Sequence, residues 1–369
     1  MSEPRPGHDI LVIGASAGGV QALCELVAGL PEDLPAAVLV VLHVSPHPSS
    51  ALPAILTRCG RLPALHPEDC TPLQPGTVYV APPDRHLTVE RGQVCINRGP
   101  RENGHRPAVD VLFRTAARAY GNRVVGVVLT GNLDDGTAGL AAIKRLGGVA
   151  IVQDPEEADY PGMPASAVEN VAVDHIASLA EIPRLLAELA HQEVEPWEEE
   201  EEPVAEHEPS EDRAHLGVDG GNPGEGYGPP SGLTCPDCGG ALYDKQEETV
   251  IGFRCRVGHA YSPEALAAAQ SEEIDAALWA AVRALEENAA LAHRLAKRMA
   301  GAGKESLESR YSSRARGSER YAQTLRKILM QDEKELAGGG GNGDLAGGNS
   351  GSARAILTPR RSPRARNLE

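Results

Sequence analysis

The chain of 369 residues is long enough for one large domain or two smaller ones, and 41% of its residues are hydrophobic. Its net charge is -17, and thirteen acidic residues but only one basic residue lie between Glu193 and Glu225. An acidic chain without a basic stripe is a poor candidate for binding nucleic acid through phosphates. The sequence has no signal region and no apolar run long enough to cross a bilayer, so we expect a cytoplasmic protein that inserts into no membrane.

The first half of the chain alternates strand-like and helical segments. The apolar, β-branched runs expected as strands are 9–13, 36–43, 76–81, 124–130 and 148–153. The patterns expected as helices are 20–29, 109–120, 138–147 and 177–190. Near-continuous apolar strands are typical of a parallel sheet that helices cover on both faces. We therefore predict a doubly wound α/β domain, Rossmann-like, over residues 1–192.

The composition changes after this domain. Residues 193–231 are rich in Glu, Pro and Gly, too polar to bury a core, and are predicted to be a linker. A compact Cys/His segment and a helical stretch follow, and we expect them to form one module over 232–336. The Gly- and Asn-rich remainder, 337–369, is predicted to be a disordered tail.

The first predicted strand runs into a cluster of small residues around Ser16, with Gly14 before it and Gly18 after it. A dinucleotide fingerprint needs glycine where Ser16 stands, and no Gly-Lys-Ser/Thr follows to make a phosphate-binding P-loop. The pattern fits a nucleophile elbow, in which small neighbours expose the serine hydroxyl and helix amides face a developing oxyanion. From this stretch alone, a serine that merely caps the helix is the alternative.

Two further strand ends carry polar side chains. His43 closes the strand 36–43, and the pair Asp134 and Asp135 follows the strand 124–130. The carboxyl ends of parallel strands meet at one edge of the sheet, where ligand chemistry is usual. Taken singly, such residues are more often turns, helix caps or structural groups. Together with Ser16, they predict a Ser-His-Asp site at this edge.

Five motifs of this region, taken in order, resemble a known family. They are IGASAGG, LHVSPHPSSALPAIL, PGTVYVAPPDRHLTV, RPAVDVLF and VVLTGNLDDGTAGLAAIKRLGGVAIVQDPEEADYPGMPASAV. From about Asp9 to Ala190, the chain is similar to the catalytic domain of the chemotaxis protein-glutamate methylesterases of the CheB type. The resemblance implies hydrolysis of glutamate methyl esters on chemoreceptors and, in many members, deamidation of receptor glutamines.

The resemblance also implies roles for individual residues. Ser16 would be the nucleophile, His43 the general base and Asp135 the orienting acid, in a reaction through an acyl-enzyme that needs no cofactor. The chain departs from the family pattern Thr-Gly-Met-Gly-x-Asp-Gly, because Asn132 and Leu133 replace Met and Gly. We expect this chain to lack the receiver domain usual in the family, because only eight residues precede the first predicted strand, and we therefore expect control by some means other than its phosphorylation.

Three of the seven cysteines cluster with a histidine, in the pattern Cys235-x2-Cys238-x16-Cys255-x3-His259. Three thiolates and one imidazole suit a closed tetrahedral zinc site, around which a short segment can fold. We predict a structural zinc ion there, in a zinc-ribbon-like module, with four unlinked residues as the alternative. The remaining cysteines stand singly and are expected to be reduced thiols.

The helical stretch after this segment carries a thin apolar seam. The positions that recur every seven residues are Leu278, Leu285, Ala292 and Met299, with Ile274, Ala281, Asn288 and Leu295 beside them. So few large side chains favour an intramolecular helical hairpin that closes on residues 318–329, but a coiled coil stays open as the alternative.

Three functions are compatible with the sequence. The first is an esterase that acts on the cytoplasmic helices of chemoreceptors, with the C-terminal module docking other signalling proteins. The second keeps the triad but changes the acyl substrate, and the third is a zinc-containing adaptor with a vestigial esterase domain. We expect the long acidic linker to make this module a tethered partner that affects local concentration and not the chemical step. Removing its zinc or deleting residues 193–369 should therefore leave hydrolysis of a small ester nearly unchanged.

Overall fold

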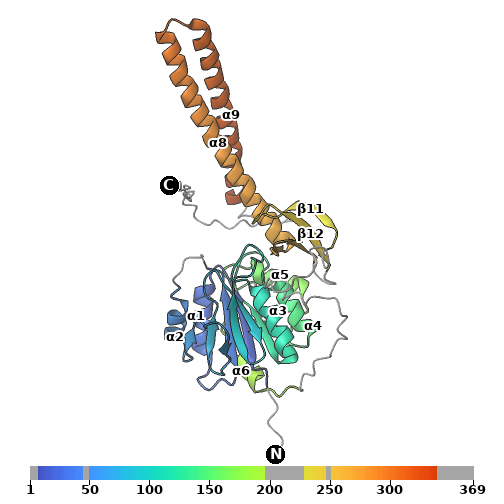
Figure 1. Cartoon of the computed structure of the whole chain (residues 1–369). Coiled ribbons are helices and arrows are strands. Elements are labelled where there is room, and N and C mark those ends of the chain that lie inside the picture. Colours follow the sequence, from blue (N-terminus) through green and yellow to red (C-terminus); the bar gives the residue numbers. More distant parts are fainter. Residues whose placement is uncertain (1–6, 45–49, 196–227, 247–250, 339–369) are drawn as a thin grey trace, which may run out of the picture. The chain divides into compact units, whose positions relative to one another are not determined.

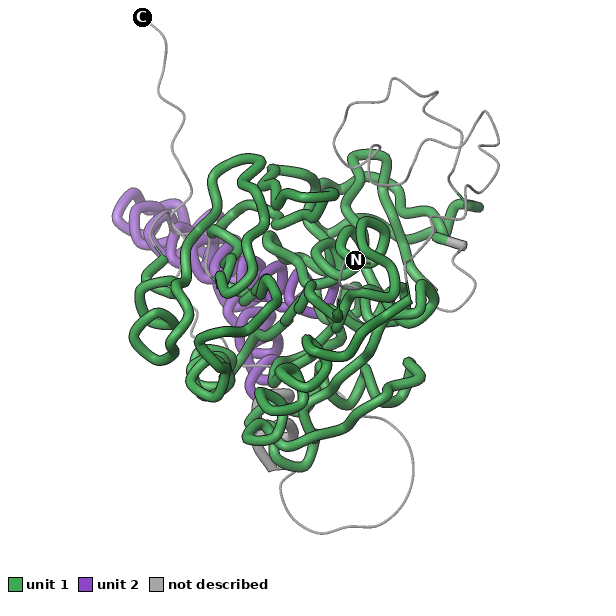
Figure 2. The backbone as a smooth tube through the Cα atoms, turned by 90° about the horizontal axis from the view of Figure 1, so that it is seen from below, with its two compact units in different colours: residues 1–269 green, residues 270–369 purple. Residues whose placement is uncertain are grey.

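The computed structural model describes residues 7–44, 50–195, 228–246 and 251–338 (Figure 1). The chain divides into two compact units, Met1–Ala269 and Gln270–Glu369, which Figure 2 colours green and purple. The Cys/His segment therefore belongs to the first unit, together with the large sheet. Most of the predicted linker (196–227) and of the predicted tail (339–369) lies outside the described residues. No helix in the described part of the chain is long and apolar enough to span a membrane.

A seven-stranded parallel sheet forms the centre of the first unit (Figure 1). Its central strands are runs of Val, Leu and Ile because both of their faces are buried. Ile10 pairs with Ala37 on one side and with Val124 on the other. In spatial order the strands are β10 (His175–Ala177), β9 (Val149–Gln153), β8 (Val124–Val128), β1 (Ile10–Ala15), β2 (Ala37–Leu42), β5 (Val78–Val80) and β3 (Ala64–Leu65).

Helices cover both faces of this sheet, which confirms the predicted doubly wound α/β fold. One apolar cluster joins the sheet to α1 (Gly19–Gly29), α2 (Leu52–Cys59) and α6 (Ile182–His191). The other joins it to α3 (Val109–Tyr120), α4 (Thr137–Arg145) and α5 (Gly162–Asn170). After β1, the chain adds β2, β3 and β5 on one side of it. The chain then crosses to the other side of β1 and adds β8, β9 and β10. The strand order thus reverses beside β1, the usual place for a site in such sheets.

Two smaller antiparallel sheets complete the first unit. One contains β4 (Thr71–Pro72), β7 (Gln93–Asn97) and β6 (His86–Glu90), and a short 3-10 helix (Gly121–Arg123) precedes β8. The other is the zinc-ribbon-like sheet of β11 (Pro230–Thr234), β12 (Ala241–Gln246), β13 (Ile251–Cys255) and β14 (Ala260–Tyr261). Sequence patterning missed β3, β4, β6, β7 and β10, because short strands with mixed polar residues carry little apolar periodicity.

Two long helices, α8 (Pro263–Gly301) and α9 (Glu305–Gly338), follow the small sheet and form a hairpin. His293 Nε2 lies 2.7 Å from Glu319 Oε1 between them. Three buried positions, Val282, Ala289 and Ala296, each lie one residue after a predicted seam position, and Ala292 is the one predicted seam position that is buried. Most of the buried positions are alanines, whereas the predicted seam residues Leu285 and Leu295 are only half-buried. Beyond Ala265 and Leu266, which pack on the small sheet, the buried positions of the described side chains are Val282, Ala289, Ala292 and Ala296 in α8 and Ala315, Ala322 and Leu329 in α9.

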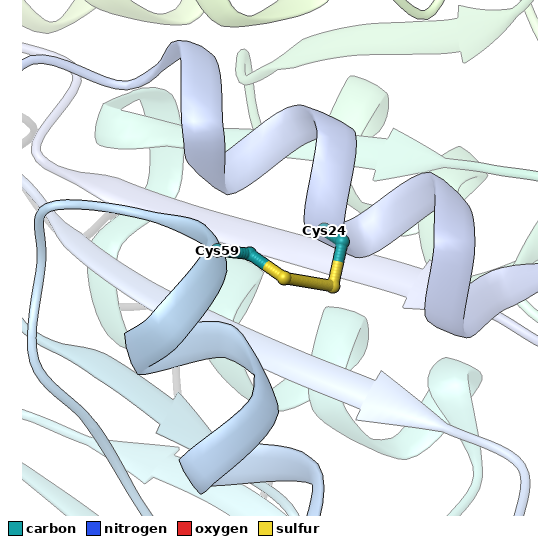
Figure 3. The surroundings of a disulfide bond; sticks show 2 residues. All are labelled: Cys24 and Cys59. Carbon is teal, nitrogen blue, oxygen red and sulfur yellow. A yellow bond between two sulfur atoms is a disulfide. The ribbon is translucent and has the colours of Figure 1, made fainter.

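A disulfide joins Cys24 in α1 to Cys59 at the end of α2 (Figure 3). The expectation that these two cysteines are reduced thiols is therefore wrong. They are 35 residues apart in the sequence and meet because α1 and α2 pack together on one face of the sheet. Spacing alone could not reveal this pair, since it depends on the tertiary position of both helices.

Breaking this disulfide should lower the free energy of unfolding. A cross-link that closes a loop of this length restricts the unfolded chain. This restriction typically raises the free energy of unfolding by about 2–4 kcal/mol. The Cys24→Ser/Cys59→Ser chain should therefore unfold at a lower urea concentration than the oxidised parent. The matched Cys70→Ser/Cys95→Ser chain should respond to a reductant as the parent does. Equal urea midpoints for the oxidised and reduced parent would contradict the prediction.

Candidate active site

Three strand ends at the carboxyl edge of the large sheet carry the predicted site residues. Ser16 directly follows β1, His43 directly follows β2, and Asp135 lies on the loop between β8 and α4. These strands are neighbours in the sheet, and the structure brings the three side chains together. His43 Nδ1 lies 3.1 Å from Ser16 Oγ, and His43 Nε2 lies 2.7 Å from Asp135 Oδ2.

The two ring nitrogens of His43 have different partners and hence different tasks. An ionised carboxylate only accepts hydrogen bonds, so Asp135 holds the proton on Nε2 and leaves the Nδ1 lone pair facing Ser16. The side chains of His43 and Asp135 are 6% and 2% exposed, whereas Ser16 is half-buried. The arrangement can therefore transfer the Ser16 hydroxyl proton to Nδ1 at a point that a ligand can reach.

The turn that presents Ser16 depends on close packing of small residues. A Cβ atom on Gly14 would lie 2.3 Å from Val109 Cγ1, and one on Gly131 would lie 2.9 Å from Ser16 Cβ. Gly18 adopts a φ of 73°, and no described side chain makes a capping hydrogen bond to α1. The first amide of α1, Gly19 N–H, donates to Ser16 O at 2.9 Å, so the helix begins directly beside Ser16, where its positive end suits an oxyanion.

Amide groups from two segments hold Asp135. Its Oδ2 accepts the N–H of Val109 at 2.7 Å, and its Oδ1 accepts the N–H of Asp110 at 3.2 Å and an Asn103 Nδ2–H at 3.1 Å. Burial opposes ionisation, but the hydrogen bond and charge of His43 outweigh it and hold the pKa of Asp135 below its ordinary range. Asp135 is therefore suited to stabilise a protonated His43.

Asp110 mirrors Asp135 at the neighbouring helix. Asp135 accepts amides at the start of α3, while Asp110 Oδ1 accepts the N–H groups of Gly136 at 3.0 Å and Gly139 at 2.6 Å at the start of α4. Burial, followed by the charge of Asp135, raises the pKa of Asp110 well above its ordinary value. The pKa values of the two neighbouring carboxyl groups are thus driven apart, with Asp135 as the ionised member.

Sequence analysis missed the turn over residues 102–105. Asn103 and Gly104 adopt φ angles of 50° and 74°, as in a type I′ turn, for which Asn-Gly is a preferred pair. The His105 ring stacks on the His43 ring, with centroids 3.8 Å apart. Burial, together with nearby His43, lowers the pKa of His105 to about 3, so this ring is neutral at pH 7. The Asn-Gly pair was the available signal, but only the fold places the turn against His43.

The loop after β8 departs from the family pattern at Leu133, which adopts a φ of 61°. Glycine takes this left-handed conformation without the steric cost that a side chain brings. The next residue, Asp134, accepts a hydrogen bond from Ser262 Oγ at its Oδ1, with a distance of 2.8 Å. Of the two adjacent acids, Asp135 is the one that contacts His43.

A second cluster of side chains lies in the Cys/His segment. The Sγ atoms of Cys235, Cys238 and Cys255 and a ring nitrogen of His259 all lie within 4.8 Å of one another. Cys255 Sγ is 3.6 Å from Cys238 Sγ and 3.5 Å from His259 Nδ1. Ligand atoms of a tetrahedral zinc ion are roughly 3.5–3.8 Å apart, given the usual metal–ligand distances. The predicted ligands are therefore together, at spacings that fit this ion.

Asp134→Asn should stabilise the chain increasingly as the pH rises. Burial is the main cause that raises the pKa of Asp134 from 3.8 to about 6. The folded state therefore binds a proton more tightly than the unfolded chain, and this contribution to stability is lost as the pH rises through about 6. Asparagine keeps the acceptor for Ser262 but carries no charge, so the variant should gain up to about 3 kcal/mol at pH 7. Urea unfolding at pH 4 and pH 7 measures the effect, and a gain independent of pH would contradict it.

Comparison with known proteins gives consistent matches over the first half of the chain. Residues 11–186 match the family CheB methylesterase. The chain is 36% identical over 189 residues to the putative protein-glutamate methylesterase/protein-glutamine glutaminase of Leptospira interrogans, with 51% of this chain and 98% of that protein covered. It is 41% identical over 181 residues to protein-glutamate methylesterase/protein-glutamine glutaminase 2 of Anaeromyxobacter dehalogenans, with 49% and 53% covered.

A solved structure, the CheB methylesterase catalytic domain of Thermotoga maritima, is 36% identical with a TM-score of 0.47, and 49% of this chain and 98% of that chain are covered. The relative from Leptospira is matched over almost its whole length, at an identity well above the level of chance similarity. The chain belongs to the CheB methylesterase family.

Proposed function

We propose that this chain is a protein-glutamate methylesterase that also deamidates glutamine, and that its substrates are chemoreceptors. The observation that carries the proposal is the hydrogen-bonded series of Ser16, His43 and Asp135 in a member of this family. The names of the relatives supply the substrate class, the γ-carboxyl esters and amides of protein side chains. The intact series argues against a vestigial esterase domain.

The reaction proceeds through an acyl-enzyme on Ser16. Ser16 Oγ attacks the ester carbonyl while His43 Nδ1 takes the hydroxyl proton, and Asp135 stabilises the resulting imidazolium through Nε2–H. Backbone N–H groups near Ala17, just before α1, donate to the oxyanion. His43 then protonates the leaving group, methanol departs, and water attacks the acyl-enzyme with His43 again acting as base. No cofactor takes part in these steps.

Deamidation uses the same groups, because a glutamine amide and a glutamate ester yield the same acyl-enzyme. The leaving group is ammonia, so His43 must deliver a proton before the bond breaks. Receptor helices that carry these side chains would place the reaction in the cytoplasm. Disulfides are uncommon in that reducing compartment, and the redox state of Cys24 and Cys59 in cells therefore tests the proposed location.

We further propose that Cys235, Cys238, Cys255 and His259 hold one structural zinc ion. The distances between the ligand atoms support this assignment. The apolar cluster of the small sheet has few members, and so small a core usually needs a metal or a cross-link. The zinc would join the knuckle after β11 to the turn after β13.

Ser16→Ala should abolish methanol release from methylated receptor fragments without unfolding the chain, because the attacking hydroxyl is lost and only a small void remains. Asp135→Asn should lower kcat by about four orders of magnitude, since the amide favours the wrong tautomer of His43. The matched variant Asp134→Asn should lose far less activity. Turnover by Ser16→Ala at the parent rate would overturn the triad, and a greater loss for Asp134→Asn would assign the acid to that residue.

The purified full-length chain should contain about one zinc ion per molecule, as metal analysis measures directly. Cys255→Ser removes one ligand and should lower the zinc content. The matched variant Cys24→Ser/Cys59→Ser changes cysteines outside every described group that could hold a metal, and it should keep the zinc. A preparation never exposed to chelator that holds no zinc would refute the site.

A further inference from the structure

The Glu102–His105 turn contacts the active site on its inner side. Within the turn, Glu102 N–H donates to His105 O at 3.1 Å, and His105 N–H donates to Glu102 O at 2.7 Å. From it, Asn103 Nδ2 donates to Asp135 Oδ1, and the His105 ring stacks on His43. One short turn thus touches both the base and the acid of the triad.

Two elements hold this turn in place. At one end, Glu102 forms a buried ion pair with Arg114 of α3, with both carboxylate oxygens 2.7 Å from Nη2. The Cys/His segment holds the turn through backbone hydrogen bonds between residues 101–103 and Ala260. Asn103 N–H donates to Ala260 O at 2.8 Å, and Ala260 N–H donates to Arg101 O at 3.2 Å. The turn is therefore bound between α3 and β14.

The Cys/His segment also sets the orientation of the Asn103 side chain. Ser262 N–H donates to Asn103 Oδ1 at 2.9 Å. With its oxygen engaged there, the amide must direct Nδ2 toward Asp135 and Asp110, whose oxygens lie 3.1 Å and 3.2 Å away. A rotated amide would place its oxygen against the Asp135 carboxylate, which donates no hydrogen bond. The Ser262 N–H therefore helps to keep a donor on Asp135.

These contacts lie directly beside the cysteine cluster. Ala260 is the residue after His259, and Gly258 is so close to Pro100 that a Cβ atom on it would lie 2.7 Å from Pro100 Cγ. Ser262 Oγ accepts the N–H of Ala265 at 3.0 Å and so caps the start of α8, while it donates to Asp134. Anything that loosens His259 thus loosens the strand that holds the turn.

We propose that the Cys/His segment is a positioning element of the active site, so that zinc binding to it is required for full turnover. The inference rests on the proposed esterase function and extends it to the control of that site. Zinc holds the turn Cys255–His259, this turn holds β14, and β14 holds Asn103 against Asp135. If the segment were only a tethered module, removing its zinc would leave hydrolysis of a small ester unchanged. In the arrangement proposed here, removing the zinc lowers it.

The test compares zinc removal in two full-length chains, the parent and Asn103→Gly. Glycine accepts the φ of 50° and removes the side chain with its amide, while the backbone hydrogen bonds of the turn can stay. Each chain is assayed on a small methyl ester with zinc bound and after chelation. Zinc removal should lower kcat of the parent by about 10-fold to 100-fold, as a small misplacement of catalytic groups does, and Asn103→Gly with zinc should show a similar loss. Zinc removal should then change Asn103→Gly little, because both changes break the same contact.

A control and a second readout complete the test. Asn122, before β8 at the opposite edge of the sheet, donates to Glu195 O, and Asn122→Gly should respond to zinc removal as the parent does. The low-field NMR resonance of the proton between His43 Nε2 and Asp135 reports their geometry without substrate. It should shift on zinc removal in the parent and not in Asn103→Gly.

The outcomes separate the two proposals. If the zinc-bound parent hydrolyses no ester, the proposed function fails, and the His43 resonance still tests the coupling. If zinc removal changes neither kcat nor this resonance in the parent, the inference is overturned. If chelation unfolds the whole chain, the test compares the zinc-bound Asn103→Gly chain with the zinc-bound parent. The same kcat and the same His43 resonance in both chains would overturn the inference.

Discussion

The active site depends on one buried carboxylate, that of Asp135. An ionised group removed from water is stable only where donors replace the water around it. Here the donors come from three separate segments: His43 after β2, the first amides of α3, and Asn103 in the turn before that helix. Each donor also fixes the position of its own segment. The site therefore behaves as one hydrogen-bonded network rather than as three independent residues.

The close packing beneath the site follows from this demand. The amides at the start of α3 reach Asp135 only if the helix approaches β1 closely, and Gly14 makes room for Val109 at that crossing. Asp110 returns the contact by accepting amides at the start of α4. Two carboxyl groups thus join α3 to the start of α4: that of Asp135, the proposed catalytic acid, and that of Asp110. A side chain at Gly14 would push apart groups that the chemistry needs together.

The Cys/His segment is hydrogen-bonded to the same network. Its sheet has a small apolar cluster and the four side chains of the proposed zinc site, so the proposed zinc would couple metal binding to folding of the segment. It also supplies Ser262, whose backbone N–H meets Asn103 and whose hydroxyl meets Asp134. A segment that looks in sequence like a tethered accessory is, in the fold, in contact with the loops around the catalytic acid. Under the proposal, ordinary hydrogen bonds would link zinc binding to the geometry of the site.

Periodicity and strand ends in the sequence by themselves determined the parallel sheet, the edge where Ser16, His43 and Asp135 gather, and the Cys/His cluster. These features are local, because a buried strand is an unbroken apolar run and a zinc knuckle is a fixed spacing. Only the tertiary structure decided the Cys24–Cys59 disulfide, the register of the α8–α9 contact, and the place of Asn103 and His105 beside the triad. Each of these joins residues that are distant in the chain, so its energy appears only once packing has brought the partners together.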